Sequence, residues 1–153
     1  MAKVKTFLAA RVRESFRDVP APDKITTLPE NEDCDSAWAA DTFRGKHWSE
    51  LTPQLVQSCP DAIVFLSPEA FRFFLPGYLL LALQDLYGMD VSLSSLLWAL
   101  AGPYYEERFS LLTEDQLLTV LAVLDAVAPD ETDPTFWEFA HAKEGVLEYL
   151  TRP

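Results

Sequence analysis

Histidine and cysteine, the side chains that most often bind metals or act as nucleophiles, are scarce in this chain of 153 residues. A structural zinc site needs about four such ligands at short, regular spacing. His47 and His141 stand far apart, and Cys34 and Cys59 form no Cys-x-x-Cys pair, so we predict no metal site. We expect His47 to lie at the surface or at a helix start beside a core tryptophan, and His141 to lie on the side of a helix.

Two further candidates for nucleophilic chemistry have simpler explanations. Cys59 lies in Ser-Cys-Pro-Asp, where the local charge is negative, whereas a reactive thiol needs a positive neighbour or a helix start to lower its pKa. Ser67 lies in Leu-Ser-Pro-Glu and not in the Gly-x-Ser-x-Gly turn of hydrolases. The five glycines stand singly, which excludes the glycine-rich loops that bind phosphates. The sequence thus predicts no catalytic residue and no cofactor.

Arg72 is the only charged residue between Glu69 and Asp85. A cation in apolar surroundings costs free energy unless a carboxylate or backbone carbonyls satisfy it. Glu69 stands three positions earlier, at a spacing where side chains on a helix meet. We therefore favour a structural ion pair between Glu69 and Arg72. The alternative is an arginine that faces a ligand in a pocket beside Pro76.

A second arginine and several aromatic side chains complete the candidate binding residues. Arg108 follows Glu106 and Glu107, so it poses the same choice between an ion pair and a ligand contact. One hypothesis is that Arg72 and Arg108 brace the central helix against the Gly-Pro connection at 102–103. An apolar groove could be lined by Trp48, Tyr78 and Tyr104, and in part by the other tryptophans, Trp38, Trp98 and Trp137.

The charge of the chain indicates what kind of partner it favours. Twelve lysines and arginines oppose 24 aspartates and glutamates, for a net charge of −12. Residues 1–24 carry six bases and three acids, so the remaining 129 residues carry six bases and 21 acids. A negative field repels phosphates and anionic lipids, and it speeds encounter with a basic protein. We therefore expect a basic protein partner and no direct binding to nucleic acid or membrane.

Two acidic stretches, at 30–35 and 130–133, could suggest cation sites. Neither has the spacing of a calcium loop, with its central glycine and terminal glutamate. We expect solvated loops that also supply helix caps.

Well-marked helix starts are the main structural signal. A hydroxyl cap followed by proline occurs at Thr52 and Ser67, and proline suits the first position of a helix. Thr113 and Gln116 form a capping box, and Asp133-Pro134 predicts the start of the last helix. Further helices are predicted at 4–19, 35–43 and 91–100. No useful run of alternating apolar and polar residues is present, so the pattern predicts an all-α protein.

The segment from 63 to 86 is apolar on nearly every side, which is typical of a central, buried helix. Pro76 lacks an N–H group and crowds the preceding turn, so it predicts a kink. A chain of this length fits one domain. We therefore predict a single-domain, irregular helical bundle around the kinked helix, with a mobile connection at 20–33.

The setting of the protein is also predicted. The start of the chain, Met-Ala-Lys-Val-Lys, lacks the apolar run of a secretion signal, and two widely separated cysteines favour reduced thiols. The longest apolar run is shorter than the roughly 20 residues that cross a bilayer, and Arg72, Pro76 and Gly77 interrupt it. These patterns predict a cytoplasmic protein without a spanning helix.

Three stretches carry a family resemblance: Trp-Ser-Glu-Leu-Thr-Pro from Trp48, Phe-Leu-Ser-Pro-Glu-Ala-Phe-Arg-Phe-Phe-Leu-Pro-Gly-Tyr from Phe65, and Arg-Phe-Ser-Leu-Leu-Thr from Arg108. Over roughly residues 48–124 the chain resembles a family of small uncharacterised bacterial proteins catalogued as a domain of unknown function. The resemblance implies a bacterial cytosolic setting. It implies no catalytic residue, because the family has no assigned activity.

Two hypotheses of function follow. The first is a non-catalytic interaction protein, of the toxin-neutralising immunity type or a regulatory one, whose acidic surface binds a basic partner. The second is a small-molecule binder or enzyme with a pocket near Arg72 and Pro76. The sequence favours the first, because the net charge is −12 and no reactive constellation is assembled. It does not indicate the oligomeric state.

Overall fold

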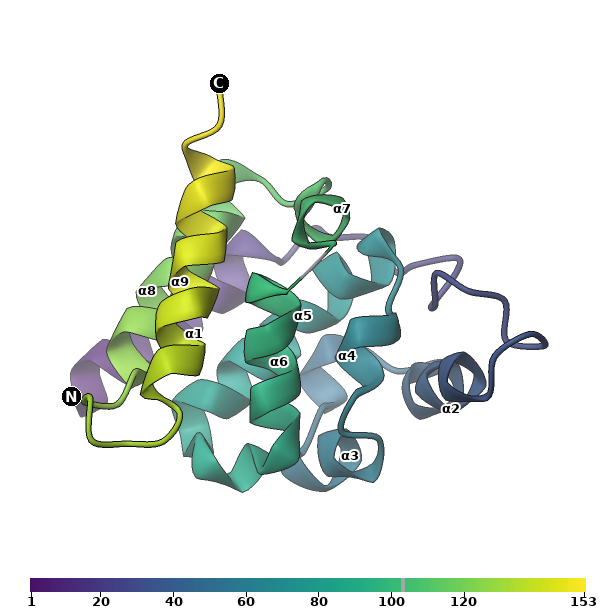
Figure 1. Ribbon diagram of the computed structural model, residues 1–153, viewed down its shortest axis with the longest axis horizontal. Coiled ribbons are helices and arrows are strands. Elements are labelled where there is room, and N and C mark those ends of the chain that lie inside the picture. The colour runs from purple at the N-terminus through teal and green to yellow at the C-terminus, as the bar shows by residue number, and fades with distance from the viewer. Residues whose placement is uncertain (103) are drawn as a thin grey trace.

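The computed structural model describes residues 1–102 and 104–153, and in these residues the chain is built from helices, without a β-strand. The all-α prediction is confirmed (Figure 1). Two short 3-10 helices, η1 and η2, accompany the α-helices. The elements are α1 (Ala2–Ser15), α2 (Cys34–Phe43), η1 (Trp48–Glu50), α3 (Pro53–Ser58), α4 (Ala62–Phe65), α5 (Pro68–Asp85), η2 (Tyr87–Met89), α6 (Val91–Ala101), α7 (Tyr105–Phe109), α8 (Glu114–Val127) and α9 (Phe136–Leu150).

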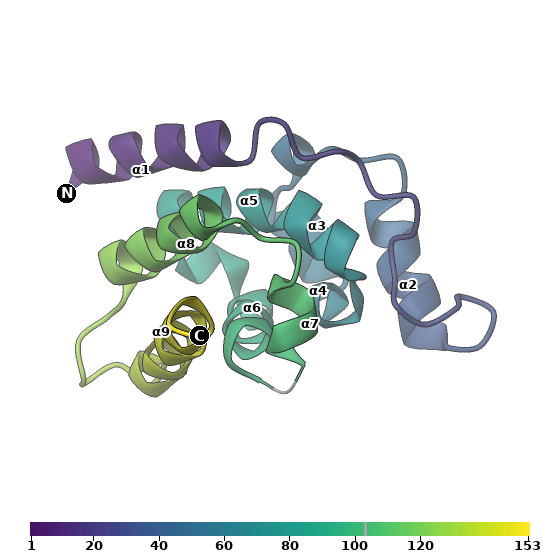
Figure 2. The same ribbon diagram turned by 90° about the horizontal axis from the view of Figure 1, so that it is seen from above.

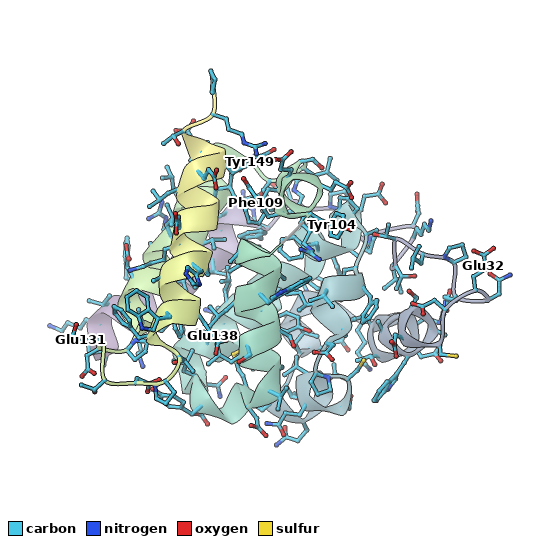
Figure 3. The ribbon with its side chains drawn as sticks, viewed as in Figure 1. Glu32, Tyr104, Phe109, Glu131, Glu138 and Tyr149 are labelled. Carbon is cyan, nitrogen blue, oxygen red and sulfur yellow. The ribbon has the colours of Figure 1, made fainter. Side chains whose placement is uncertain are left out.

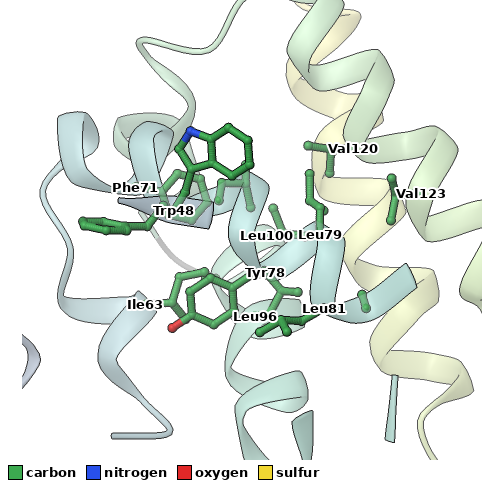
Figure 4. Close-up of a cluster of buried hydrophobic side chains, with 14 of the residues drawn as sticks. Trp48, Ile63, Phe71, Tyr78, Leu79, Leu81, Leu96, Leu100, Val120 and Val123 are labelled. Carbon is green, nitrogen blue, oxygen red and sulfur yellow. The ribbon is translucent and has the colours of Figure 1, made fainter. Parts of the chain in front are cut away.

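Helix α5 is the centre of the fold, as its apolar sequence predicts. It contacts α1, α7, α8 and both 3-10 helices. Phe71, Tyr78 and Leu79 of α5 lie fully buried in the main hydrophobic cluster. Figure 4 shows them beside Ile63 of α4 and Val120 of α8. Burial of such apolar surface is the dominant stabilising term of a domain of this size.

Proline 76 lies inside α5, which continues through it to Asp85. The carbonyl of Arg72 has no amide donor from position 76 because proline lacks an N–H group. The kink that this predicts stays a prediction. Gly77, next to it, allows close packing, since a Cβ atom there would lie 2.6 Å from the carbonyl oxygen of Trp48 in η1.

Most of the predicted helix starts are confirmed by their capping bonds. Thr52 accepts a hydrogen bond from the amide of Leu55, and Ser67 accepts one from Ala70, both at 3.1 Å. The capping box of Thr113 and Gln116 is formed. The start predicted at Asp133-Pro134 was wrong by two residues.

Helix α9 begins later, at Phe136. The Asp133 side chain is instead engaged by the backbone and hydroxyl of Thr135, so these bonds form a turn ahead of the helix. Leu147, further along α9, is half exposed.

The connection between α1 and α2 is partly tied down. Helix α1 ends at Ser15, four residues before the predicted end, and a turn follows. Further along, Thr26 pairs with Leu66 in an isolated bridge. The amide of Ser67 donates to the carbonyl of Ile25 at 2.9 Å, and its hydroxyl donates to the carbonyl of Lys24 at 2.6 Å. The mobility predicted for 20–33 stays a prediction, but residues 24–27 are anchored to the start of α5.

The helices form an elongated arrangement. The first turn of α1 and helix α2 lie at opposite ends of the molecule (Figures 1 and 2). Helix α1 lies along α8, and α6 lies along α9. Helices α6 and α9 approach each other so closely that a Cβ atom on Gly145 would lie 2.4 Å from the carbonyl oxygen of Leu100. Helix α6 ends at Ala101 with Gly102 as its cap. Pro103, the second residue of the Gly-Pro connection, lies outside the described residues.

Within residues 1–102 and 104–153, the structure has no helix that is both long enough and apolar enough to span a membrane.

Candidate functional site

The structure gives Arg72 a different partner from the one predicted. Its side chain is half-buried on α5, and its Nε atom donates to Oε1 of Gln116 on α8 at 3.3 Å. Glu69 is exposed, and the ion pairs among the described residues do not include it. The predicted pairing of Arg72 with Glu69 was therefore wrong, because Gln116 projects from a neighbouring helix toward the guanidinium.

Gln116 is a buried junction between three helices. Its Oε1 atom also accepts a hydrogen bond from the amide of Thr113 at 3.0 Å, and its Nε2 atom donates to the carbonyl of Ser15 at 3.0 Å. The amide side chain thus links the start of α8, the end of α1 and the second turn of α5. These bonds favour a structural role for Arg72 over a ligand contact.

Arg108, on α7, is 7% exposed. Its guanidinium donates hydrogen bonds to the ends of two other helices. Its Nη1 atom donates to the carbonyl of Ala99 at 3.3 Å, and its Nη2 atom donates to the carbonyl of Val64 at 3.4 Å. Both carbonyls belong to the last turn of a helix, where carbonyls lack intrahelical partners and the helix dipole favours a cation. Burial lowers the pKa of Arg108. These bonds of Arg108 join α7 to α4 and α6; they do not reach the central helix α5, so the predicted bracing of α5 by Arg72 and Arg108 stays a prediction.

The acidic neighbours of Arg108 take other roles. Glu106 forms an ion pair with Arg152 near the end of the chain, and the hydrogen bond from Arg152 lowers the pKa of Glu106. Glu107 is exposed, although its charge acts to raise the pKa of Arg108. The adjacent sequence positions therefore gave the wrong partners for this guanidinium, whose main contacts come from backbone carbonyls.

The predicted aromatic groove of Trp48, Tyr78 and Tyr104 is not formed. Trp48 and Tyr78 are buried in the core. Tyr104 is exposed at the start of α7 (Figure 3), with a φ of 72°. Two core residues and one surface residue cannot line a common open groove.

The histidines and cysteines stay apart. His47 is exposed and caps η1 beside the buried Trp48, as predicted. Cys59 is buried, and this burial raises the pKa of its thiol, which disfavours the nucleophilic thiolate. Cys34 and His141 are exposed. Among the residues that the structure describes, no three histidine, cysteine or acidic side chains are grouped to hold a metal ion.

A cleft of about 580 Å³ lies on the outer face of α6, which runs between α9 and α4 (Figure 1). We call it the α6 cleft. Its lining combines an apolar floor with a few polar groups at the sides, which is typical of binding sites. The lining residues are Asp61 and Val64 from the α4 region, Val91, Ser94, Ser95, Leu97, Trp98 and Ala101 from α6, and Glu138 and His141 from α9.

The polar groups of the α6 cleft are acidic or neutral. Ser95 donates its hydroxyl proton to Oδ1 of Asp61 at 2.6 Å. Glu138 stands on the first turn of α9, next to α6 (Figure 3). Lysine and arginine are absent from the described lining. The cleft therefore favours a positively charged group.

The same geometry argues against nucleophilic catalysis in the α6 cleft. A catalytic serine is activated by a hydrogen bond to a base, which is itself oriented by a third group. Ser95 instead bonds directly to a carboxylate, and the hydrogen bonds of the described lining residues include none between a serine and His141. The bond to Asp61 fixes both side chains and leaves Oδ2 of the carboxylate for other contacts.

Sequence reasoning missed the α6 cleft apart from Trp98. A signal was present, because positions 91, 94, 98 and 101 follow one another on a single face of a helix. That face mixes valine, serine, tryptophan and alanine, and so it does not stand out from a buried one. The walls come from α4 and α9, which are distant in sequence.

Two other hollows lie elsewhere on the surface of the described residues. One, of about 370 Å³, lies between residues 22–30 and the end of α2, where Arg44 pairs with Glu30. The other is an open hollow along the exposed side of α9. Arg72 and Pro76 do not line any of the three hollows described here.

The structure thus defines an all-α protein with a buried central helix and an acidic, partly apolar surface cleft. The model of a family of unknown function (DUF6714) matches residues 5–149, so the chain belongs to that family. Comparisons with curated proteins and with solved structures give no match.

Proposed function

We propose that this protein is a non-catalytic interaction module whose acidic surface binds a basic partner protein. The observation that carries the proposal is uncompensated negative charge. The sequence has 24 acidic residues, and the ion pairs among the described residues engage six of them. Glu32 and Glu131 project at opposite ends of the molecule (Figure 3), so the negative field covers a wide surface.

Electrostatics would act mainly on the rate and selectivity of binding. A negative field steers a basic protein toward the surface, and it suppresses association with acidic ones. Affinity needs buried anchors as well, for which tryptophan is the preferred residue in many interfaces. Trp38, Trp98 and Trp137 are each about half exposed or more, and so they supply candidate anchors.

The biological setting that fits this module is a bacterial cytoplasm. There, a small acidic protein of this kind would act as an immunity-type protein that neutralises a basic toxin, or as a regulatory binding protein. The absence of a reactive group at Ser95, together with the raised pKa of Cys59, supports binding over catalysis. The alternative of a ligand pocket near Arg72 and Pro76 has no specific observation in its favour, because Arg72 is bonded to Gln116.

Affinity capture with the full chain as bait, followed by mass spectrometry, tests the proposal. We expect a partner of basic composition that is retained at low salt and lost at high salt, because salt screens exposed charges. A matched variant neutralises four exposed carboxylates outside the ion pairs, Glu32→Gln, Glu131→Gln, Glu144→Gln and Glu148→Gln. It should associate more slowly with the same partner. A captured partner that is acidic, or that binds equally at all salt concentrations, would refute the proposal.

A further inference from the structure

We infer that the α6 cleft is the docking site for a lysine or arginine side chain presented by an extended segment of the partner protein. This inference rests on the proposed function and names the part of the acidic surface that recognises the partner. Four observations support it: the apolar floor, the two carboxylates, the fixed tryptophan and the exposed apolar residue at the end of the cleft.

The apolar floor suits the aliphatic part of a basic side chain. Lysine and arginine pack their methylene stems along apolar surface and keep their charged head in a polar environment. Val64, Leu97 and Ala101 lie with Trp98 around the cleft. At about 580 Å³ the cleft is large enough for one long side chain and part of its backbone.

The carboxylates of Asp61 and Glu138 suit the charged head. Asp61 comes from the start of α4 and Glu138 from the first turn of α9, so they flank α6 from opposite sides. The hydroxyl of Ser95 orients Asp61 through Oδ1 and leaves Oδ2 to accept a bond from an incoming cation. Such charge-assisted bonds are the stronger ones, and more so where water is partly excluded.

Trp98 is held in place before any partner arrives. The guanidinium of Arg108 lies 5.3 Å from the centre of its ring, and the same guanidinium bonds to the carbonyl of Ala99. Trp98 nevertheless stays 47% exposed. An aromatic anchor that is already fixed loses little conformational entropy on binding. The carbonyl oxygens of Ala99 and Val64 accept hydrogen bonds from the guanidinium of Arg108, so their dipoles offset part of its charge.

The end of the cleft favours a protein segment over a free amine. Val91 lines the cleft and is 57% exposed, so it offers a second apolar contact beyond the basic side chain. An extended segment can cover it with an apolar residue next to the lysine or arginine. A single amino acid has no neighbouring side chain to cover Val91 while its own side chain contacts a carboxylate.

The test uses the full chain, labelled with nitrogen-15, and a blocked hexapeptide, acetyl-Ala-Leu-Arg-Leu-Lys-Ala-amide. We expect saturable changes in the NMR signals of Val91, Ser95 and the Trp98 indole. A control peptide with citrulline and norleucine in place of arginine and lysine keeps the length but removes the charge. It should bind about tenfold more weakly.

Matched protein variants locate the site. The variant Asp61→Asn with Glu138→Gln keeps side-chain shape, and it should lower peptide affinity about tenfold. The control Glu69→Gln with Glu114→Gln removes the same charge at exposed positions outside the cleft, and it should bind the peptide nearly as the natural protein does. Melting temperatures of both variants check that each is folded.

Three outcomes would overturn the inference: peptide-induced changes outside the α6 cleft, equal binding of the uncharged peptide, or equal binding of acetyl-arginine-amide, which would point to a small-molecule site. The failure of this inference differs from failure of the proposed function. A basic partner that is captured in a salt-sensitive way, and equally by the Asp61→Asn with Glu138→Gln variant, would keep the function and exclude this docking site.

Discussion

The Nε atom of Arg72 on α5 donates a hydrogen bond to Oε1 of Gln116 on α8, 44 positions further along the chain. The same oxygen closes the capping box at the start of α8. The charge in the central helix is thus satisfied by an amide that the fold already holds in place. A guanidinium bound in this way through its Nε atom contributes to the docking of α8 on α5.

Gln116 is expected to be a sensitive position for stability. Its replacement by leucine would remove the three hydrogen bonds that the side-chain amide makes. These bonds join it to the amide of Thr113, the carbonyl of Ser15 and the Nε atom of Arg72. We predict a loss of about 2–4 kcal/mol in the free energy of unfolding, measured by urea denaturation. The control Gln84→Leu, at an exposed position of α5, should change stability by less than about 0.5 kcal/mol. Equal stability of the two variants would contradict the junction role.

Arg108 is expected to require its guanidinium and not only its charge. Arg108→Met should cost about 2–4 kcal/mol, because two helix carbonyls lose a charged donor. Arg108→Lys should recover little of that loss, since a single ammonium cannot reproduce the fork of donors. Thermal unfolding measures both. Arg13→Met on the exposed side of α1 is the matched control, and a full rescue by lysine would show that geometry does not matter here.

Tyr78 is expected to tolerate the loss of its hydroxyl group. The hydroxyl is buried, and it has no hydrogen-bond partner among the described residues; burial raises the pKa of Tyr78, so the group stays protonated. Tyr78→Phe removes a desolvated polar atom, and we predict unchanged stability or a gain of up to about 1 kcal/mol.

Tyr87 provides the contrast. Its hydroxyl donates to Oδ2 of Asp133 at 2.8 Å, so Tyr87→Phe should lower the melting temperature slightly. A larger loss from Tyr78→Phe than from Tyr87→Phe would indicate an ordered water at the Tyr78 hydroxyl.

Stability near Asp133 is expected to depend on pH. Hydrogen bonds from the hydroxyl and amide of Thr135, and then from Tyr87, lower the pKa of Asp133 in the folded protein. A lowered pKa stabilises the fold above the ordinary aspartate value of about 3.9, and this contribution is lost as the pH falls below it. The stability difference between the natural protein and Asp133→Asn should therefore shrink on acidification through that range. Urea midpoints across the range measure it, and a difference that grows on acidification would contradict the assignment.

The contact between α6 and α9 is expected to require glycine. A Cβ atom at Gly145 would meet the carbonyl oxygen of Leu100, which is backbone and cannot rotate away. Gly145→Ala should cost about 1–3 kcal/mol through displacement of the two helices. Glu144→Ala, at an exposed neighbour on the same helix, is the control for altered helix propensity. An unchanged melting temperature for Gly145→Ala would show that the helices can separate freely.

Structural features that depend on residues close together in the sequence could be predicted. The caps at Thr52, Ser67 and Thr113 depend on backbone amides three positions away, so their residue types are sufficient. The burial of α5 follows from its composition alone. The start of α9 was misplaced because a turn at Thr135 uses the same residue types as a cap.

Hydrogen bonds between side chains on different helices could not be predicted in this way. Arg72 lies beside Glu69 in the sequence but beside Gln116 in space, and the choice is made by how α8 docks on α5. The α6 cleft needs residues from α4 and α9, and the position of α9 on α6 depends on close packing at Gly145. A single sequence carries no local signal for such a meeting of three elements.

The bonds between α1 and α8 have a consequence for synthesis. Ser15 bonds to Asp115, 100 positions later in the chain, so α1 leaves the ribosome well before α8 and completes its docking only when α8 has been made. Until then, Leu8 and Val12, which are buried in the finished fold, are exposed on the nascent polypeptide. Contacts between residues far apart in the sequence slow folding, and the apolar surface that stays exposed meanwhile favours aggregation.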